Sequence, residues 1–123
     1  MYRLLAIVML LAALGPLAAL EQAEQHAIDA LIVWVTKQPD TVRFIRNGSD
    51  YATSDAVKLM RNKWDSQKDA VQTADDFIQL CASRSEHSGK RYRIRLADGS
   101  ERDSSEVLRE QLTFIRAAAA AKP

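Results

Sequence analysis

Apolar residues recur along the chain with two periods, one typical of helices and one of strands. Between residues 21 and 37, Ile28, Leu31, Ile32 and Val35 follow the i, i+3, i+4, i+7 spacing of a helix that buries one face. Similar patterns predict three further helices: 53–68 capped by Thr53 or Ser54, 74–83 with a capping box of Thr73 and Asp76, and a last one capped by Ser104 or Ser105.

Segment 91–96 alternates apolar and polar positions, as a half-buried strand does. Tyr92, Ile94 and Leu96 fall on one face, and arginines fall on the other. Segment 42–46 is a second short strand, rich in β-branched and aromatic residues. Because a lone strand cannot satisfy its backbone hydrogen bonds, we expect these two segments to pair.

Turn residues follow both strands. Asn47 and Gly48 close the first strand, since both tolerate a positive φ, and we expect a loop through Asp50 and Tyr51 after them.

Charge selects the loop length of a hairpin after the second strand. A two-residue loop would place two arginines opposite each other, which is unfavourable. A three-residue loop with Gly99 in the left-handed conformation instead pairs Arg95 with Glu101 and Arg93 with Asp103. We therefore predict the three-residue loop.

The predicted order is helix, strand, helix, helix, strand, short strand, helix. Because two or three short strands are marginal alone, the helices must supply most of the core. This order predicts an α+β fold, a small two- to three-stranded antiparallel sheet packed by about four helices, in one domain over 20–123.

Residues 1–19 have the layout of a secretory signal peptide. Arg3 precedes the uncharged apolar run 4–14, and the small residues Ala18 and Ala19 stand just before the first acid. The run is too short for a comfortable membrane span of about 20 residues. We expect cleavage after Ala18 or Ala19, export to the periplasm, and no stable membrane insertion of the mature chain.

Composition narrows the function classes. The 123 residues carry 17 basic and 16 acidic side chains, so no overall positive field favours nucleic acid. Cys81 is the single cysteine, which excludes an intramolecular disulfide, and its apolar setting predicts a buried thiol. His26 and His87 lie far apart without acids or thiols at ligand spacing, so we expect neither a metal site nor another cofactor.

Arg46 has the strand parity of the residues that face the core, so we expect its guanidinium on the same side, at the margin. One interpretation is a functional pocket for an acidic ligand, shared with Asn47 and Lys63. The other is a structural clamp that ties the turn to a helix end. Its candidate partners are Asp50, Asp55 and Asp76.

The serine-rich loop 83–89 offers several hydrogen-bond donors. It lacks the second glycine and the hydroxyl residue of a Walker-type phosphate loop. The open alternatives are a small-anion site and a solvated turn. The donors of an anion site would be Ser83, Ser85, Ser88, the Gly89 backbone and Lys90.

The combination of these motifs over about 44–112 resembles the YfeK-like family of small secreted bacterial proteins of unknown function. The resemblance implies export and no known catalytic residue. The positions that match the family pattern are Arg46, Asn47, Gly48, Lys63, Ser85, Ser88, Gly89, Lys90 and Tyr92.

We therefore expect a periplasmic, non-enzymatic binding or interaction module. Its composite site forms where the turn 46–48 meets the loop 83–92, and its partner is a small anionic ligand or a periplasmic protein. One alternative is a small hydrolase or transferase that uses a loop serine or the Arg46/Lys63 pair. Another is an adaptor that docks a partner through Trp34 or Trp64.

Overall fold

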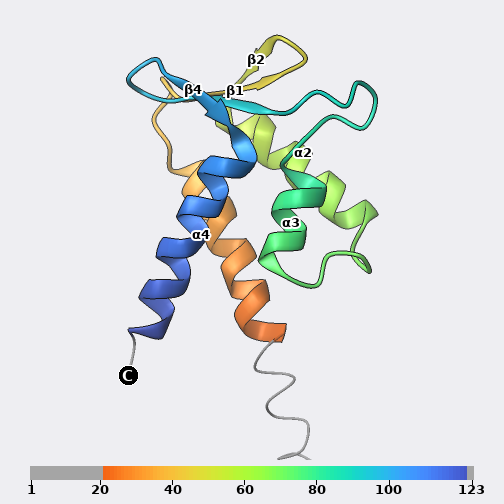
Figure 1. Ribbon diagram of the computed structural model, residues 1–123, viewed down its shortest axis with the longest axis vertical. Helices are drawn as coiled ribbons and strands as arrows, with labels where there is room; N and C mark the ends of the chain where they lie inside the picture. Colours follow the sequence, from red (N-terminus) through yellow and green to blue (C-terminus); the bar gives the residue numbers. More distant parts are fainter. Residues whose placement is uncertain (1–20, 122–123) are drawn as a thin grey trace, which may run out of the picture.

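The computed structural model describes residues 21–121, so the predicted signal peptide, 1–19, lies outside the described residues. The elements, in chain order, are a helix over 21–36, β1 (Arg43–Arg46), β2 (Ser49–Tyr51), α2 (Thr53–Ser66), α3 (Ala74–Cys81), β3 (Arg93–Arg95), β4 (Glu101–Asp103) and α4 (Ser104–Ala120) (Figure 1). Four helices and four strands within 21–121 confirm the α+β fold.

The four strands form one antiparallel sheet in the order β2-β1-β3-β4. β1 pairs with β3, as predicted. The expected loop through Asp50 and Tyr51 is wrong, because these residues form β2. Asn47 and Gly48, with φ of 52° and 81°, make a two-residue hairpin turn that continues the ladder and sets Tyr51 opposite Phe44.

The predicted register of the second hairpin is confirmed. Arg95 pairs with Glu101 and Arg93 with Asp103, across a loop in which Gly99 has a φ of 90°. A residue with a Cβ would be strained at that φ, so the turn requires glycine.

The capping predictions have mixed outcomes. The capping box is confirmed, since Thr73 Oγ1 accepts from the Asp76 amide and the Asp76 carboxylate accepts from the Thr73 amide. The other two caps are wrong: α2 has Ala52 at its N-cap and α4 has Asp103, neither with a side-chain cap bond. The Asp103 carboxylate cannot turn to its own helix, because it is bound by two arginines.

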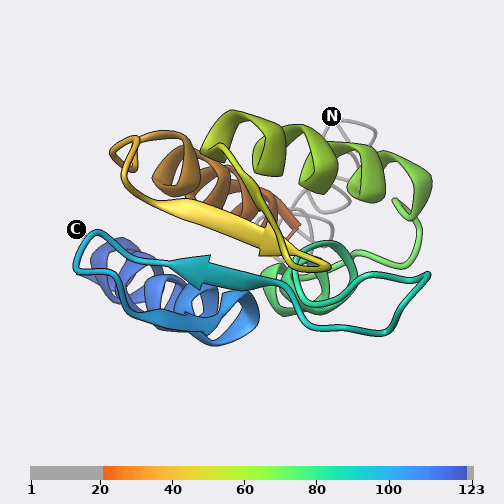
Figure 2. The ribbon, with the colours of Figure 1, turned by 90° about the horizontal axis from the view of Figure 1, so that it is seen from above.

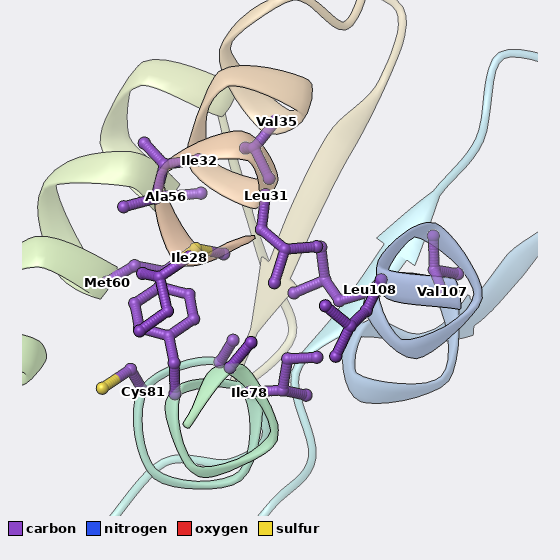
Figure 3. Close-up of a cluster of buried hydrophobic side chains, with 14 of the residues drawn as sticks. Ile28, Leu31, Ile32, Val35, Ala56, Met60, Ile78, Cys81, Val107 and Leu108 are labelled. Carbon is purple, nitrogen blue, oxygen red and sulfur yellow. The ribbon is translucent and has the colours of Figure 1, made fainter. Parts of the chain in front are cut away.

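The helices lie on one side of the sheet (Figures 1 and 2). Their inward faces meet Phe44 and Ile94 of the sheet in one core. Figure 3 shows how the helix of residues 21–36 supplies Ile28, Leu31 and Ile32 at the centre of that core. No helix within 21–121 is long and apolar enough to cross a membrane.

Candidate functional site

A pocket of about 450 Å³ lies between the β1–β2 hairpin and α2, and we call it the hairpin pocket. This volume is in the range of small-molecule sites. Its apolar wall includes Phe44, Tyr51, Leu59, Met60 and Tyr92. Its charged members are Arg46, Lys58 and Asp55, so positive charge exceeds negative charge.

Arg46 lines this pocket from the inner side of β1, the side predicted from its strand parity. Its Nε atom is buried and has no hydrogen-bond partner among residues 21–121. The structural-clamp interpretation is wrong, because Arg46 forms no ion pair within that part of the chain. Asp50 binds Arg95, and Asp76 closes the capping box of α3.

The turn 46–48 and the loop 83–92 meet, as predicted. Ser88 Oγ donates a hydrogen bond of 2.5 Å to Asn47 Oδ1, and the Lys90 amide donates to Ser88 Oγ at 3.2 Å. Gly89, with a φ of 71°, forms the turn that allows this approach. All four residues are exposed, and none of them lines the hairpin pocket.

Lys63 does not line the hairpin pocket. Its ammonium donates to the Tyr92 hydroxyl and to the Arg84 carbonyl oxygen, each at 2.9 Å. Tyr92 is buried and contributes to the pocket wall. Lys63 therefore fixes a wall residue, a positioning role in place of the predicted ligand contact.

Ser85 is almost fully buried, with 1% of its surface exposed. The Ser85 carbonyl oxygen accepts a hydrogen bond from the Gly89 amide, and the Ser85 amide donates one to the Lys90 carbonyl oxygen. These two bonds close the loop. Its hydroxyl has no partner among residues 21–121. A ligand in solution cannot reach this hydroxyl, so Ser85 cannot serve as one of the five donors of the predicted anion site.

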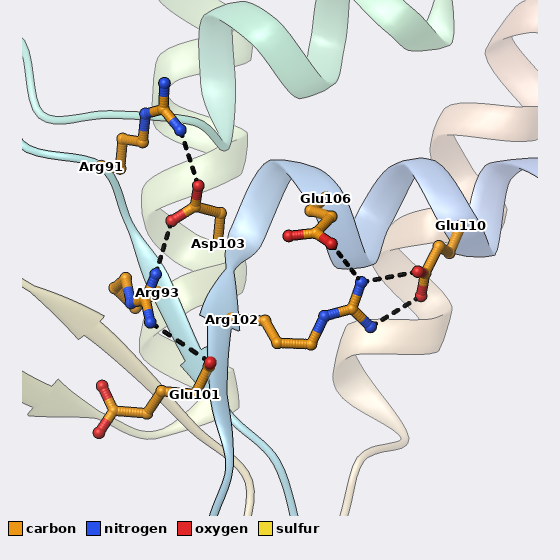
Figure 4. A network of polar contacts seen from close by, with 7 residues as sticks. All are labelled: Arg91, Arg93, Glu101, Arg102, Asp103, Glu106 and Glu110. Carbon is orange, nitrogen blue, oxygen red and sulfur yellow. Dashed lines mark hydrogen bonds and ion pairs between the residues drawn. The ribbon is translucent and has the colours of Figure 1, made fainter.

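Arginines of β3 lie opposite acids of β4, and Figure 4 shows one such pair, Arg93 and Asp103. Asp103 accepts from Arg91 and Arg93 at 2.8 Å each, and these bonds lower the pKa of its carboxyl. Arg95 binds Asp50 at 2.6 Å and lies 3.7 Å from Glu101. The predicted pairing of Arg93 and Arg95 with acids of β4 is confirmed, whereas Arg43, which lies opposite Arg95 on β1, forms no ion pair within residues 21–121.

Thiol and metal chemistry have little support. Cys81 is fully buried, as predicted, and desolvation raises the pKa of its thiol to about 11. Within residues 21–121 there is no cluster of three histidine, cysteine, aspartate or glutamate side chains suited to a metal ion.

Comparison with known proteins identifies the family of this chain. Residues 22–116 match the model of a family described as "Family of unknown function (DUF5329)". The chain belongs to this family. The DUF5329 chain is also 32% identical over 87 residues to "Uncharacterized protein YfeK" of Salmonella typhimurium (strain LT2), a match that covers 71% of this chain and 72% of that protein. No solved structure matches it.

Several pocket residues of this DUF5329 chain were missed by sequence reasoning. Tyr51 was placed in a loop, although its position after a two-residue turn puts it opposite Phe44. Lys58 is exposed and lies on the face of α2 away from buried Ala56 and Met60, so helical spacing gave no signal for it.

Proposed function

We propose that this chain is an exported binding protein, and that the hairpin pocket takes a ligand with one carboxylate and an apolar body. The observation that supports this most directly is the buried Arg46 Nε without a partner. Burying a polar group without a hydrogen bond costs stability. A carboxylate bound there would offset this cost.

The chemistry of the walls favours such a ligand. A guanidinium presents its N–H groups as a planar fork that matches a carboxylate. Tyr51, Tyr92 and Met60 offer aromatic rings and a polarisable thioether to an apolar body. The Asn47–Ser88 bond would hold the hairpin turn, and therefore Arg46, in place.

The same contacts give no support to the alternatives. Ser88 Oγ donates to an amide oxygen, which is no general base, and Ser85 is buried. Trp34 and Trp64 are both partly buried against the core, and Trp64 packs edge-on against Phe77 at 5.6 Å. Neither indole forms the exposed stripe that an adaptor would use.

Export is a separate part of the proposal, and cell fractionation tests it. The full chain with a C-terminal tag should appear in the periplasmic fraction. Its first residue should be Ala19 or Leu20, which N-terminal sequencing identifies. A chain that keeps Met1 in the cytosol contradicts export.

Binding is tested with three eight-carbon probes on the purified chain: octanoate, octanol and octylamine. Calorimetry should show the highest affinity for octanoate, because only octanoate carries a carboxylate that can pair with Arg46. Arg46→Gln should lower the affinity for octanoate by about tenfold, which corresponds to the loss of one charge-assisted hydrogen bond. Arg61→Gln, an exposed position on α2 outside the pocket, is the matched control. Equal affinity for octanol and octanoate, or an equal loss in the control, would overturn the carboxylate assignment.

A further inference from the structure

A second, smaller groove lies between α3, the segment 83–92 and the start of α4. Its volume is about 290 Å³, and its surface is mainly polar. The residues that line it are Gln79, Ser83, Arg84, Arg91, Ser105 and Arg109. It shares no lining residue with the hairpin pocket. We call it the arginine groove.

Backbone pairing explains why two arginines meet there. Arg84 and Arg91 form an isolated antiparallel bridge, reinforced by the hydrogen bond from the Tyr92 amide to the Ser83 carbonyl. Residues directly opposite each other in an antiparallel pair have side chains on the same face, about 5 Å apart at Cβ. Arg109 adds a third guanidinium from α4, one helical turn after Ser105.

These arginines lack the acids that other arginines of the chain have. Three other arginines each contact two carboxylates: Arg95 with Asp50 and Glu101, Arg102 with Glu106 and Glu110, and Arg116 with Glu24 and Asp75. Arg84 and Arg109 form no ion pair within residues 21–121. Arg91 has only Asp103, which it shares with Arg93 (Figure 4).

Arg84 and Arg91 lie directly opposite each other, and of the two only Arg91 has an ion-pair partner among residues 21–121. Like charges placed directly opposite each other destabilise a strand pair. An oxyanion in the groove would relieve the repulsion and accept hydrogen bonds from several guanidinium groups at once.

We propose that the arginine groove binds the phosphoryl group of a phosphomonoester or of inorganic phosphate, held by Arg84, Arg91 and Arg109. A doubly charged tetrahedral group can accept hydrogen bonds from three arginines that line one groove, and it carries more negative charge than a carboxylate. The groove is small, so the phosphoryl group binds inside it while the rest of an ester lies in solvent. Ser105 and Gln79 supply further polar contacts at its wall.

The experiment titrates the purified full chain, in phosphate-free buffer of fixed ionic strength, with inorganic phosphate and with glycerol phosphate. Calorimetry should detect binding of at least one probe. Arg84→Gln and Arg109→Gln should each weaken it by about tenfold. Arg61→Gln and Arg46→Gln should leave it unchanged, and this separates the groove from the hairpin pocket. The tighter of the two probes identifies the source of the phosphoryl group.

Thermal unfolding without phosphate supplies the second measurement. Arg84→Gln and Arg109→Gln should unfold at the same temperature as the wild type or higher, because each removes a repulsive charge. Phosphate should raise the unfolding temperature of the wild type and of Arg61→Gln more than that of Arg84→Gln or Arg109→Gln. The proposal is overturned if neither probe binds at millimolar concentration, if Arg61→Gln loses as much affinity as the groove variants, or if the groove variants unfold at lower temperature without phosphate.

Discussion

Ser88 Oγ donates a hydrogen bond to Asn47 Oδ1 at 2.5 Å, although the two residues are 41 positions apart. Asn47 also holds the left-handed position of the β1–β2 turn, with a φ of 52°. One side chain therefore closes a turn and joins it to the loop 83–92. The hairpin that carries Arg46 is anchored at its tip by this contact.

A double-mutant cycle should measure the strength of that anchor. Asn47→Gly removes the side chain while glycine keeps the positive φ without strain. Combined with Ser88→Ala, it should give a coupling energy of about 0.5–1.5 kcal/mol in urea unfolding, the usual net value of a hydrogen bond. Additive effects of the two substitutions would show that the contact contributes nothing in solution.

Asp103 should make the stability of the protein depend on acid pH. Its pKa is lowered by hydrogen bonds from Arg91 and Arg93. A carboxyl with a folded-state pKa below its unfolded value contributes stability at neutral pH, and this is lost as pH falls through the folded-state pKa. Asp103→Asn should therefore lower the free energy of unfolding at pH 7 and flatten its decline below about pH 4.

Asp69→Asn is the control for that experiment, since Asp69 is exposed and lies between α2 and α3. Urea titrations at a series of pH values compare the two variants with the wild type. An acid decline in Asp103→Asn as steep as in the wild type would contradict the assigned role.

Much of the sheet could be predicted because local signals and charge agreed. Alternation identified the central strands, and the signs of Arg93, Arg95, Glu101 and Asp103 selected the register that the structure has. The strand β2 could not be predicted in this way. It consists of Ser49–Tyr51, and Asp50 has low strand propensity. The strand forms because of the turn before it and the ion pair of Asp50 with Arg95, which lies on the next strand but one.

The candidate site was only partly predictable, because sequence parity gives the side of a strand but not the partner. Arg46 was placed on the correct side of the strand, but its partner was not identified. Of its three candidate acids, Asp50 binds Arg95, Asp76 closes the capping box of α3, and Asp55 lines the pocket. Arg84 and Arg109 gave no signal, because their meeting depends on the packing of α4 against the end of α3.

Ser85→Ala should not destabilise the protein. The buried Ser85 hydroxyl has no partner among the described residues, so its removal leaves no other polar group unsatisfied. Thr73→Ala offers a contrast, since loss of its capping bond should cost about 1 kcal/mol. Chemical unfolding of both variants checks this. A cost in Ser85→Ala as large as in Thr73→Ala would reveal a hydrogen bond formed by that hydroxyl in solution.

Cys81 should make the protein sensitive to alkaline pH. Burial raises the pKa of its thiol to about 11, from 9.0, against an opposing effect of Lys63. Well below pH 9 the thiol is protonated in both the folded and the unfolded state, so its ionisation does not affect stability. As pH rises from 9 toward 11, the thiol ionises more readily in the unfolded state, so the free energy of unfolding falls. The wild type should therefore lose stability across this interval more steeply than Cys81→Ala in parallel urea titrations.

Thiol reagents should label Cys81 only as fast as the chain opens, since no thiolate is exposed in the folded state. Rapid labelling of the native protein at pH 8 would contradict both expectations.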